Sequence, residues 1–424
     1  MTLLSDGPTT LSPARIRFAL LALALGGFGI GSTEFVAMGL LPNIAQDLLP
    51  GVYAQSPEEA NATAGWIISA YALGVVVGAP TIAAAAARWP RKRLLLALLV
   101  TFTLATIASA LLPTFGLVLV ARFISAVPHG AYFGIASLVA ASLMGPGKRA
   151  RGVALVLSGL TIANVIGVPA ITWLGQAAGW RIAYLAVAGI FALTFVAVLL
   201  AVPWQPGDER ATMKRELRAF SRSQVWFALA IGAIGFGGLF AVYSYVAPLA
   251  TDVTGLPLAA VPLVLIVFGI GMTIGNFAGG RLADWSVRRS MYVFFAILAA
   301  ALVLLGFTAW SPVGLAAGVF LVGASSAALS PTIQARLMDV ARDSQSIASA
   351  LNHSALNIGN ALGALAGGMA IAAGLGYVAP IWIGLLLTIA GSVLAVTSFA
   401  LDRSRGRRGV VVPYATGAVE VVEA

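Results

Sequence analysis

One carboxylic acid, Glu34, lies well inside a long apolar stretch of this sequence. It precedes Pro42, where that stretch ends, by eight residues, which is a depth of roughly 12 Å in a helix that rises 1.5 Å per residue. A charged side chain inside a bilayer costs at least about 2.5–3.5 kcal/mol, so an acid at such a position predicts a functional site. The chemistry that a carboxyl group offers there is reversible binding of a proton.

Arg122 is the basic residue that lies deepest in another apolar stretch, six residues or roughly 9 Å from its start. Its depth agrees with that of Glu34 within the reach of the two side chains. Burial and a neighbouring guanidinium act on a carboxyl group in opposite senses, and this competition would allow proton exchange when the surroundings change. We therefore predict proton coupling at Glu34 and Arg122. A permanent structural ion pair is the alternative.

His129 follows Arg122 by seven residues, so both face the same way on a helix, and Phe133 continues that face. A histidine can relay protons or bind a substrate. A packing role is the alternative, and it is the commoner one for a lone histidine in a helix. Pro128 removes one backbone hydrogen bond and predicts a kink in this helix.

Four further residues are candidates to line a substrate cavity: Tyr243, Tyr245, Asn164 and Asn360. The two tyrosines have an amphipathic character, although aromatic residues are common in membrane helices. Interhelical hydrogen bonding is the simpler interpretation of the asparagines. Asn360 belongs to a polar stripe at helical spacing, which consists of Ser346, Ser349, His353, Asn357 and Asn360.

Long apolar helices must position these residues, because 60% of the chain is hydrophobic and only 9% is charged. A bilayer core of about 30 Å needs about 20 apolar residues per crossing. The sequence therefore predicts an all-α membrane protein with twelve transmembrane helices. They are predicted at approximately 17–41, 61–87, 94–112, 116–144, 150–175, 181–202, 223–250, 259–283, 290–309, 313–338, 344–372 and 378–400.

The distribution of basic residues predicts the orientation. Of the 25 Lys and Arg residues, all but Arg122 and Arg181 cluster on every second connection between the apolar stretches. This is the positive-inside pattern of a multi-pass protein of the cell membrane. It predicts that both termini are cytoplasmic and that Gln55 and Gly255 face the other side.

The sequence divides into two six-helix bundles that form a parallel repeat. A shift of 197 residues aligns Gly74 and Gly78 with Gly271 and Gly275, and a shift of 196 aligns Asn164 with Asn360. Parallel repeats of this kind place a substrate site between the bundles, near the middle of the bilayer. The predicted organisation is a cytoplasmic segment 1–16, a first bundle 17–202, a cytoplasmic linker 203–222 whose part 208–222 is a candidate amphipathic helix, a second bundle 223–401 and a cytoplasmic tail 402–424.

The chain resembles the major facilitator superfamily from Arg17 to Leu401. The family's signature between the second and third helices of each half is Gly-x-x-x-Asp-Arg-x-Gly-Arg-Arg. The second half keeps it well, whereas the first half has Ala87 at the Asp position and Pro90 at the later Gly position. The resemblance implies a conformational motif made of Gly78, Arg88, Arg91, Gly280, Asp284, Arg288 and Arg289, together with Gly167 and Pro169 of a shortened antiporter motif.

More specific segments are similar to the drug:proton antiporter group, which includes chloramphenicol-resistance and arabinose-efflux-like exporters. They are Gly31-Ser32-Thr33-Glu34-Phe35, Gly39-Leu40-Leu41-Pro42, Ser69 to Gly74, Arg122 to Gly130, Asn164 to Pro169 and Gly179-Trp180-Arg181. The resemblance implies export of a small amphipathic molecule, such as chloramphenicol, in exchange for protons by alternating access. A sugar or nucleoside exporter and an uncoupled facilitator or importer remain alternatives.

Other classes of function find no support in the sequence. The chain has neither an HExxH nor a G-x-S-x-G motif, so we expect no enzyme. With no cysteine and two histidines, we expect no metal site and no cofactor. The net charge of +10 lies in short clusters beside apolar segments and favours contact with lipid headgroups over nucleic acid. We expect a monomer whose partners are the lipid bilayer, protons and a small-molecule substrate.

Overall fold

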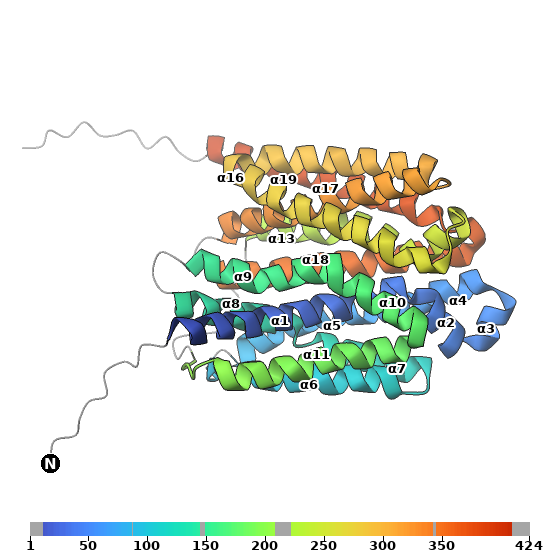
Figure 1. Ribbon diagram of the computed structural model, residues 1–424. Helices are drawn as coiled ribbons and strands as arrows, with labels where there is room; N and C mark the ends of the chain where they lie inside the picture. The colour runs from blue at the N-terminus through green and yellow to red at the C-terminus, as the bar shows by residue number, and fades with distance from the viewer. Residues whose placement is uncertain (1–11, 87, 145–148, 208–221, 342–344, 409–424) are drawn as a thin grey trace, which may run out of the picture.

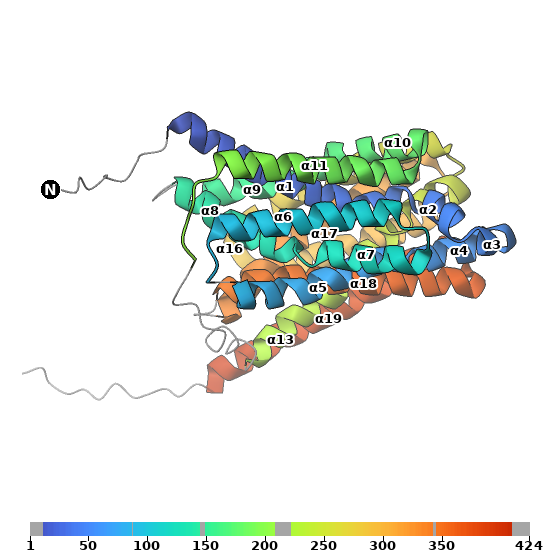
Figure 2. The same cartoon turned by 90° about the horizontal axis from the view of Figure 1, so that it is seen from below.

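Long helices run side by side along one direction of the molecule (Figures 1 and 2). The computed structural model describes residues 12–86, 88–144, 149–207, 222–341 and 345–408. All regular structure in these ranges is helical, which confirms the predicted all-α class. The candidate amphipathic helix at 208–222 and the end of the predicted tail, 409–424, lie outside the described ranges except for Arg222.

In the described part of the first half, four crossings are continuous helices, and two, the fourth and the fifth, are interrupted near their middle. This half also contains three short helices, α2 to α4, of which α4 overlaps the start of the predicted crossing 61–87 and the other two lie between predicted crossings. The elements are α1 (Pro13–Gly39), α2 (Leu41–Leu48), α3 (Pro50–Gln55), α4 (Pro57–Ala64), α5 (Trp66–Ala86), α6 (Arg91–Leu111), α7 (Phe115–Ala126), α8 (His129–Met144), α9 (Arg149–Ile162), the π-helix η1 (Ala163–Gly167), α10 (Val168–Ala178) and α11 (Trp180–Ala201).

The second half has the same general order with more interruptions in its first crossing. Its elements are α13 (Ser223–Ala230), the π-helix η3 (Ile231–Gly235), α14 (Gly237–Tyr243), α15 (Val246–Pro248), the π-helix η4 (Leu249–Val253), the 3-10 turn η5 (Leu258–Ala260), α16 (Val261–Thr308), α17 (Pro312–Ala341), α18 (Gln345–Ala370), the π-helix η6 (Ile371–Leu375) and α19 (Ala379–Arg408).

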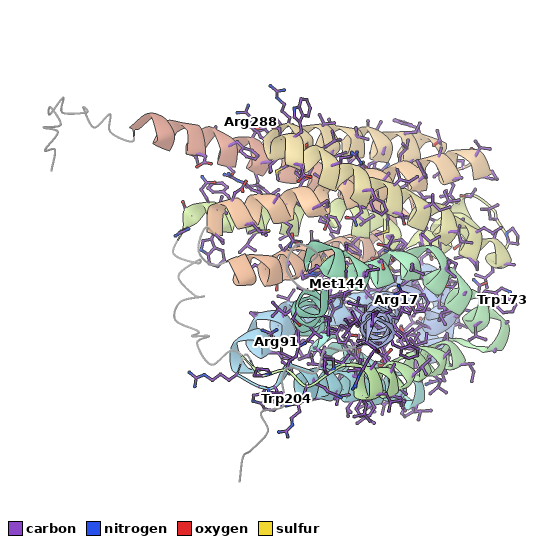
Figure 3. All side chains as sticks on the ribbon, turned by 60° about the vertical axis from the view of Figure 1, so that its left-hand side comes forward. Arg17, Arg91, Met144, Trp173, Trp204 and Arg288 are labelled. Carbon is purple, nitrogen blue, oxygen red and sulfur yellow. The ribbon has the colours of Figure 1, made fainter. Side chains whose placement is uncertain are left out.

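Two ends of the molecule are used as landmarks below. The α2–α4 end carries the three short helices, and the terminal end is where α1 begins at Pro13 and α19 ends at Arg408 (Figure 1). Figure 3 shows Trp173 at the α2–α4 end, while Arg91 and Trp204 lie toward the terminal end.

Eleven stretches of the described residues are long and apolar enough to cross a membrane. One of them, Leu258–Thr308, has 51 residues, so it would be about 75 Å long as a straight helix where one crossing needs about 30 Å. Its backbone leaves the helical region at Ser286, with φ −165° and ψ 102°. The stretch therefore contains the two predicted crossings at 259–283 and 290–309, and the break between them is one residue rather than a loop.

Proline and π-helical turns break the helices where they pass the centre of the molecule. The fourth predicted crossing is interrupted between Ala126 and His129, at Val127 and Pro128, which confirms the predicted kink. The π-helical turn η1 ends at Gly167, directly before α10, whose second residue is Pro169. Such turns are frequent at functional sites because they widen the helix and redirect its side chains.

The parallel repeat is visible in the packing of two equivalent glycines. A Cβ atom at Gly78 would collide with the backbone carbonyl of Val127, and one at Gly275 would collide with that of Ala324. The same offset of 197 residues separates both the glycines and the residues that they face. The two halves therefore pack their second crossing on their fourth through the same close backbone approach, which only glycine permits.

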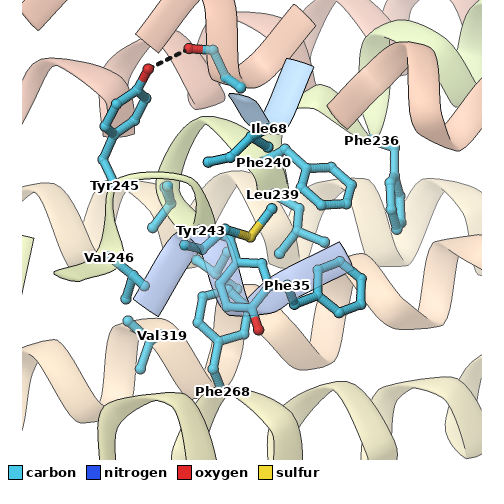
Figure 4. Packing of buried hydrophobic residues seen from close by; sticks show 14 of the residues in the cluster. Phe35, Ile68, Phe236, Leu239, Phe240, Tyr243, Tyr245, Val246, Phe268 and Val319 are labelled. Carbon is cyan, nitrogen blue, oxygen red and sulfur yellow. Dashed lines mark hydrogen bonds between the residues drawn. The ribbon is translucent and has the colours of Figure 1, made fainter. Parts of the chain in front are cut away.

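The apolar core extends across both halves, and large apolar side chains also cover the outer face of the bundle. One cluster belongs to the first half, and a larger one includes Phe35 of α1 together with Tyr243 and Phe268 of the second half (Figure 4). On the outside, Phe277 is 74% and Phe307 is 71% exposed. Exposed apolar surface of this extent is typical of side chains that contact lipid.

Candidate functional site

Glu34 lies in the last third of α1, at the junction of the two halves, and is only 5% exposed. Its Oε1 accepts a long hydrogen bond of 3.5 Å from Nδ2 of Asn360 on α18. Its Oε2 lies 3.9 Å from Nδ1 of His129 on α8. The carboxyl group thus contacts one polar side chain from each half, and any relative movement of the halves would change its surroundings.

Arg122 is fully buried in α7 and is held by the residue that precedes Glu34. One terminal nitrogen of its guanidinium donates to Thr33 Oγ1 at 2.9 Å, and the other donates to the Thr33 carbonyl at 2.8 Å. The group also lies over the ring of Tyr71, 4.3 Å from its centroid, and 5.3 Å from that of Tyr184. The ion pairs found among the described residues do not include Glu34 with Arg122, so the two predicted residues are neighbours without a direct salt bridge.

Both histidines of the chain meet next to Glu34. Nδ1 of His129 lies 3.2 Å from the hydroxyl of Tyr71, and the rings of His129 and His353 have their centroids 6.1 Å apart. Phe133 stacks on His353 with a centroid distance of 5.7 Å and nearly parallel rings. A chain of proton-binding groups, Glu34, His129 and His353, therefore extends from α1 through α8 to α18.

The two predicted tyrosines of the second half have different surroundings. Tyr243 packs on Phe35, the residue after Glu34, with ring centroids 5.5 Å apart, and on Phe268 at 4.4 Å. Tyr245 donates its hydroxyl to the Ala364 carbonyl at 2.7 Å (Figure 4). Tyr243 therefore belongs to the surroundings of Glu34, whereas Tyr245 contacts α18 of its own half.

Several buried polar atoms on the helices that pack around α1 and on α1 itself have no hydrogen-bond partner among the described residues. Asn164, which is 6% exposed, presents a side-chain oxygen of this kind, and its backbone carbonyl faces Gly269 of the second half. Leaving a buried polar group unpaired costs about 1–3 kcal/mol, and such groups can bond to the polar parts of a bound molecule. The buried atoms without a hydrogen-bond partner in this region are Ser32 Oγ, Arg122 Nε, Asn164 Oδ1, Asn357 Oδ1 and Asn360 Oδ1.

The residues of the conformational motif lie away from this cluster, toward the terminal end. Gly280 faces open space, and Asp284 is exposed, with no hydrogen bond or ion pair to another described residue. Arg289 lies over the ring of Trp285, and Arg288 is half-buried. In the first half Arg88 is exposed, and Arg91 donates to the side chain of Gln205 at 3.5 Å.

The shortened antiporter motif packs against α1. A Cβ atom at Gly167 would lie 2.8 Å from the ring of Phe28 and from Ser32 Oγ. Pro169 is buried at the second residue of α10. The motif therefore holds α10 close to the turn of α1 that precedes Glu34.

Polar contacts between the halves occur at the centre and at the α2–α4 end. Nδ2 of Asn61 in α4 donates to the hydroxyl of Tyr377 at 2.7 Å, and this bond is buried. Nε2 of Gln176 in α10 donates to the Leu258 carbonyl at 3.1 Å. The hydrogen bonds between described residues include none that joins the halves at the terminal end. The structure is therefore closed at the α2–α4 end.

Four residues around the site were not predicted to act there: Thr33, Tyr71, His353 and Tyr184. His353 carried a signal, because it lies on the polar stripe with Asn360. Tyr71 and Thr33 lie in segments that carry the family resemblance. Tyr184 gave no signal, because nothing in its apolar helix distinguishes it from a core tyrosine.

These features define a membrane transport protein built from two six-helix halves with a polar centre. The family model of the Major Facilitator Superfamily matches residues 23–341 and 254–413. The chain belongs to this superfamily.

Individual relatives agree with this assignment. The chain is 40% identical over 363 residues to the inner membrane transport protein YdhP of Escherichia coli K12, which covers 86% of this chain and 91% of that protein. It is 33% identical over 376 residues to the chloramphenicol resistance protein of Streptomyces lividans, with 88% and 94% covered. The crystal structure of a D-xylose–proton symporter has the same fold, with a TM-score of 0.73, 16% identity and 90% and 97% of the two chains covered.

Proposed function

We propose that this protein is a secondary active transporter that exports a small amphipathic molecule, of the size and polarity of chloramphenicol, in exchange for protons. Similarity to a chloramphenicol resistance protein over 88% of the chain supports the class of cargo. The mixture of aromatic rings and unpaired amide oxygens at the centre supports it independently. An amphipathic cargo would place its apolar part on rings such as Phe35 and Tyr243 and its polar part on Asn164 and Asn360.

The observation that carries the proposal is the position of Glu34 between the halves. Its carboxyl group contacts Asn360 of the second half and approaches His129 of the first. In the closed arrangement the carboxyl group is tolerated best when it is neutral, because the ionised form has little solvent and no direct cationic partner. When the halves separate, water and cargo reach the carboxyl group and it can release the proton.

Proton and cargo must favour different states for this exchange to work. A ligand shifts a two-state equilibrium only through its differential affinity for the two states. Protonated Glu34 favours the occluded arrangement in which Asn360 is close. Ionised Glu34 favours an arrangement in which polar cargo, water or Arg122 meets the charge. His129 and His353 extend the path along which the proton travels.

We propose further that the terminal end faces the cytoplasm and that the α2–α4 end faces outward. The basic clusters near Arg17, Arg91 and Arg288 support this orientation through the positive-inside pattern. The conformation described above is then closed to the outside. A single chain supplies both halves of the central site, so we propose that the protein acts as a monomer.

The test is Glu34→Gln in reconstituted vesicles that contain a pH-sensitive dye. Glutamine keeps the shape and the neutral hydrogen bonding of the protonated acid but carries no exchangeable proton. We expect normal insertion, retained cargo binding and loss of both concentrative export and cargo-driven proton flux. Glu59→Gln is the matched control, because Glu59 is an exposed residue of α4 outside the central cluster. Export and proton flux of wild-type size in Glu34→Gln would place the coupling elsewhere.

Two assays separate this proposal from the alternatives. A drug-susceptibility panel in an exporter-deficient host would show protection against amphipathic drugs for a drug exporter and none for an exporter of sugars or nucleosides. Uptake of labelled cargo into vesicles without preloaded cargo, measured with and without a pH gradient, would show accumulation above the outside concentration only with the gradient if transport is coupled. An uncoupled facilitator would only equilibrate the cargo in both conditions.

A further inference from the structure

A cavity lies at the α2–α4 end, away from the Glu34 cluster. It has a volume of about 670 Å³, and both halves contribute to its lining. Asn43, Tyr53, Glu58 and Asn61 belong to the first half, and Asp252 and Tyr377 belong to the second. None of the residues that contact Glu34 lines it.

Two residues that line this cavity, Asn61 and Asn43, carry buried hydrogen-bond acceptors without a partner. Asn61 is 2% exposed, and its Nδ2 is occupied by the bond to Tyr377. Its Oδ1 has no partner, and neither does the buried Oδ1 of Asn43. Because an unpaired buried acceptor costs about 1–3 kcal/mol, these two oxygens favour a ligand that brings N–H or O–H donors.

The charged residues that line the cavity favour cationic ligands among those with N–H or O–H donors. Its charged members, Glu58 and Asp252, are both acidic, and no basic residue is among the described lining residues. Partial burial raises the pKa of Asp252, and the hydrogen bond from Thr251 lowers it. Burial raises the pKa of Tyr377 to about 12, against the hydrogen bond from Asn61, so this residue is a neutral hydroxyl. A cation would be attracted by both carboxylates and repelled by nothing in the lining.

Aromatic side chains complete the site. Tyr53 and Tyr377 both line the cavity, and tyrosine faces accept methylene groups as well as ammonium groups. The combination of two rim carboxylates, two unpaired amide oxygens and two aromatic rings corresponds to an aliphatic stem with a protonated amine at each end.

We propose that this cavity binds an aliphatic diamine or polyamine, with ammonium groups at Glu58 and Asp252 and N–H donors to Asn61 and Asn43. Because the binding residues come from both halves, an occupied site stabilises the closed arrangement of the α2–α4 end. The site is independent of proton coupling at Glu34.

Binding is measured with unmodified protein in nanodiscs, by titration calorimetry with 1,5-diaminopentane. We expect saturable binding. The bis-trimethylammonium analogue keeps the charges but has no N–H donors, and we expect it to bind about tenfold more weakly. The neutral 1,5-pentanediol should show no saturable binding. Equal affinity for either analogue, or no saturable binding of the diamine, would overturn the proposal.

Two neighbouring glutamates provide a matched pair of variants. Glu58 and Glu59 both lie in the first turn of α4, and both are exposed, but only Glu58 lines the cavity. We expect Glu58→Gln to weaken binding of the diamine about fivefold, which is the upper range for an exposed ion pair. Glu59→Gln should leave the affinity unchanged. If both substitutions weakened binding equally, nonspecific attraction to the negative surface charge would explain the binding, and the proposed site would be wrong.

The consequence for the conformation is tested with Ala62→Cys, since the chain has no native cysteine. Ala62 of α4 is 6% exposed and packs where α4 meets Gly368 of α18. Its thiol reacts with a maleimide only when the α2–α4 end opens. We expect 1,5-diaminopentane to slow this labelling in proportion to occupancy, with no effect of 1,5-pentanediol. Saturated binding without slower labelling would show that the ligand does not bridge the halves.

Discussion

Removal of one hydroxyl group, in Tyr377→Phe, should increase the fraction of molecules that are open at the α2–α4 end. That hydroxyl accepts the buried 2.7 Å hydrogen bond from Asn61 and thereby joins the two halves. Phenylalanine keeps the ring and its packing. Because the bond can exist only while the halves are together at this end, its loss acts on the closed state and not on the open one.

The magnitude follows from the kind of bond. A hydrogen bond between neutral groups contributes about 1 kcal/mol net, which corresponds to a roughly fivefold change in the equilibrium between the two states. The effect can be larger here, because Oδ1 of Asn61 already has no partner. After the substitution both polar atoms of this buried amide would be unsatisfied, and the full penalty is about 1–3 kcal/mol.

The assay is the rate of maleimide labelling at Ala62→Cys, combined with each substitution. If opening and closing are fast compared with labelling, the rate is proportional to the open fraction, and Tyr377→Phe should raise it about fivefold. Tyr53→Phe is the matched control, since Tyr53 lines the same cavity and its hydroxyl has no hydrogen bond in the structure. In the double variant Asn61→Leu/Tyr377→Phe no polar group is stranded, so the rate should fall below that of Tyr377→Phe alone.

Equal labelling rates in Tyr377→Phe and Tyr53→Phe would refute the reasoning, because they would show that the bond does not distinguish the closed state. A double variant that labels faster than Tyr377→Phe would refute the argument about the stranded amide. Thermal unfolding of each variant shows whether a faster rate comes from opening or from general loss of structure.

Three further predictions concern the helices and their ends. Gly275→Ala should lower the unfolding temperature, since overpacking against the Ala324 carbonyl costs about 1–3 kcal/mol. Gly280→Ala places its methyl group in open space and should stabilise the helix by up to about 1 kcal/mol through helix propensity. Equal changes of the unfolding temperature in the two variants would contradict the close backbone approach at Gly275. If Asp284 gains a partner when the α2–α4 end is open, Asp284→Asn should slow transport while the amount of protein in the membrane stays unchanged. A normal transport rate would show that the motif only determines the orientation of the chain in the membrane. Reporter fusions should place both termini and Arg210 in the cytoplasm and Gln55 and Gly255 outside, and an outward Arg210 would overturn the orientation.

The sequence predicted the crossings well, because each needs an apolar run of a fixed length. It also assigned Glu34 and Arg122 to similar depths, and the two residues are neighbours in the structure. It did not predict that Arg122 binds Thr33 instead of the carboxylate. Depth fixes the height of a side chain in the bundle, but the partner also depends on the rotation of each helix and on rotamers, which a single sequence does not specify.

The short helices α2 and α3 and the start of α4 were not predicted, because the segment 42–60 is mixed in polarity and rich in proline. Each of the three has a proline in its first helical turn, at Pro42, Pro50 and Pro57. Proline at such positions favours the start of a helix because its missing N–H would be unpaired there anyway. Ser56 also caps α4 by accepting a hydrogen bond from the Glu59 backbone. The prolines of this segment therefore mark where helices begin, and not where they are interrupted.

The contact between His129 and His353 could not be predicted, because the two residues are brought together only when the halves pack. The same holds for Asn61 and Tyr377. Equivalent positions of a repeat can be aligned within a sequence, but contacts across the junction follow from the angle between the bundles. Under the proposed alternating access that angle would change during transport, so a sequence pattern that encoded one state alone would not describe the protein.

The hydrogen bonds that close the α2–α4 end are few, as the proposed alternating access requires. The direct hydrogen bonds found there between described residues, Asn61 to Tyr377 and Gln176 to Leu258, amount to about 1 kcal/mol each. To change a two-state ratio from 1:99 to 99:1 takes about 5.5 kcal/mol of differential binding. If a proton at Glu34 drives the change of state as proposed, such a small number of polar contacts keeps closure within the range that one ligand can reverse. A gate built from many buried bonds would instead hold the transporter in one state.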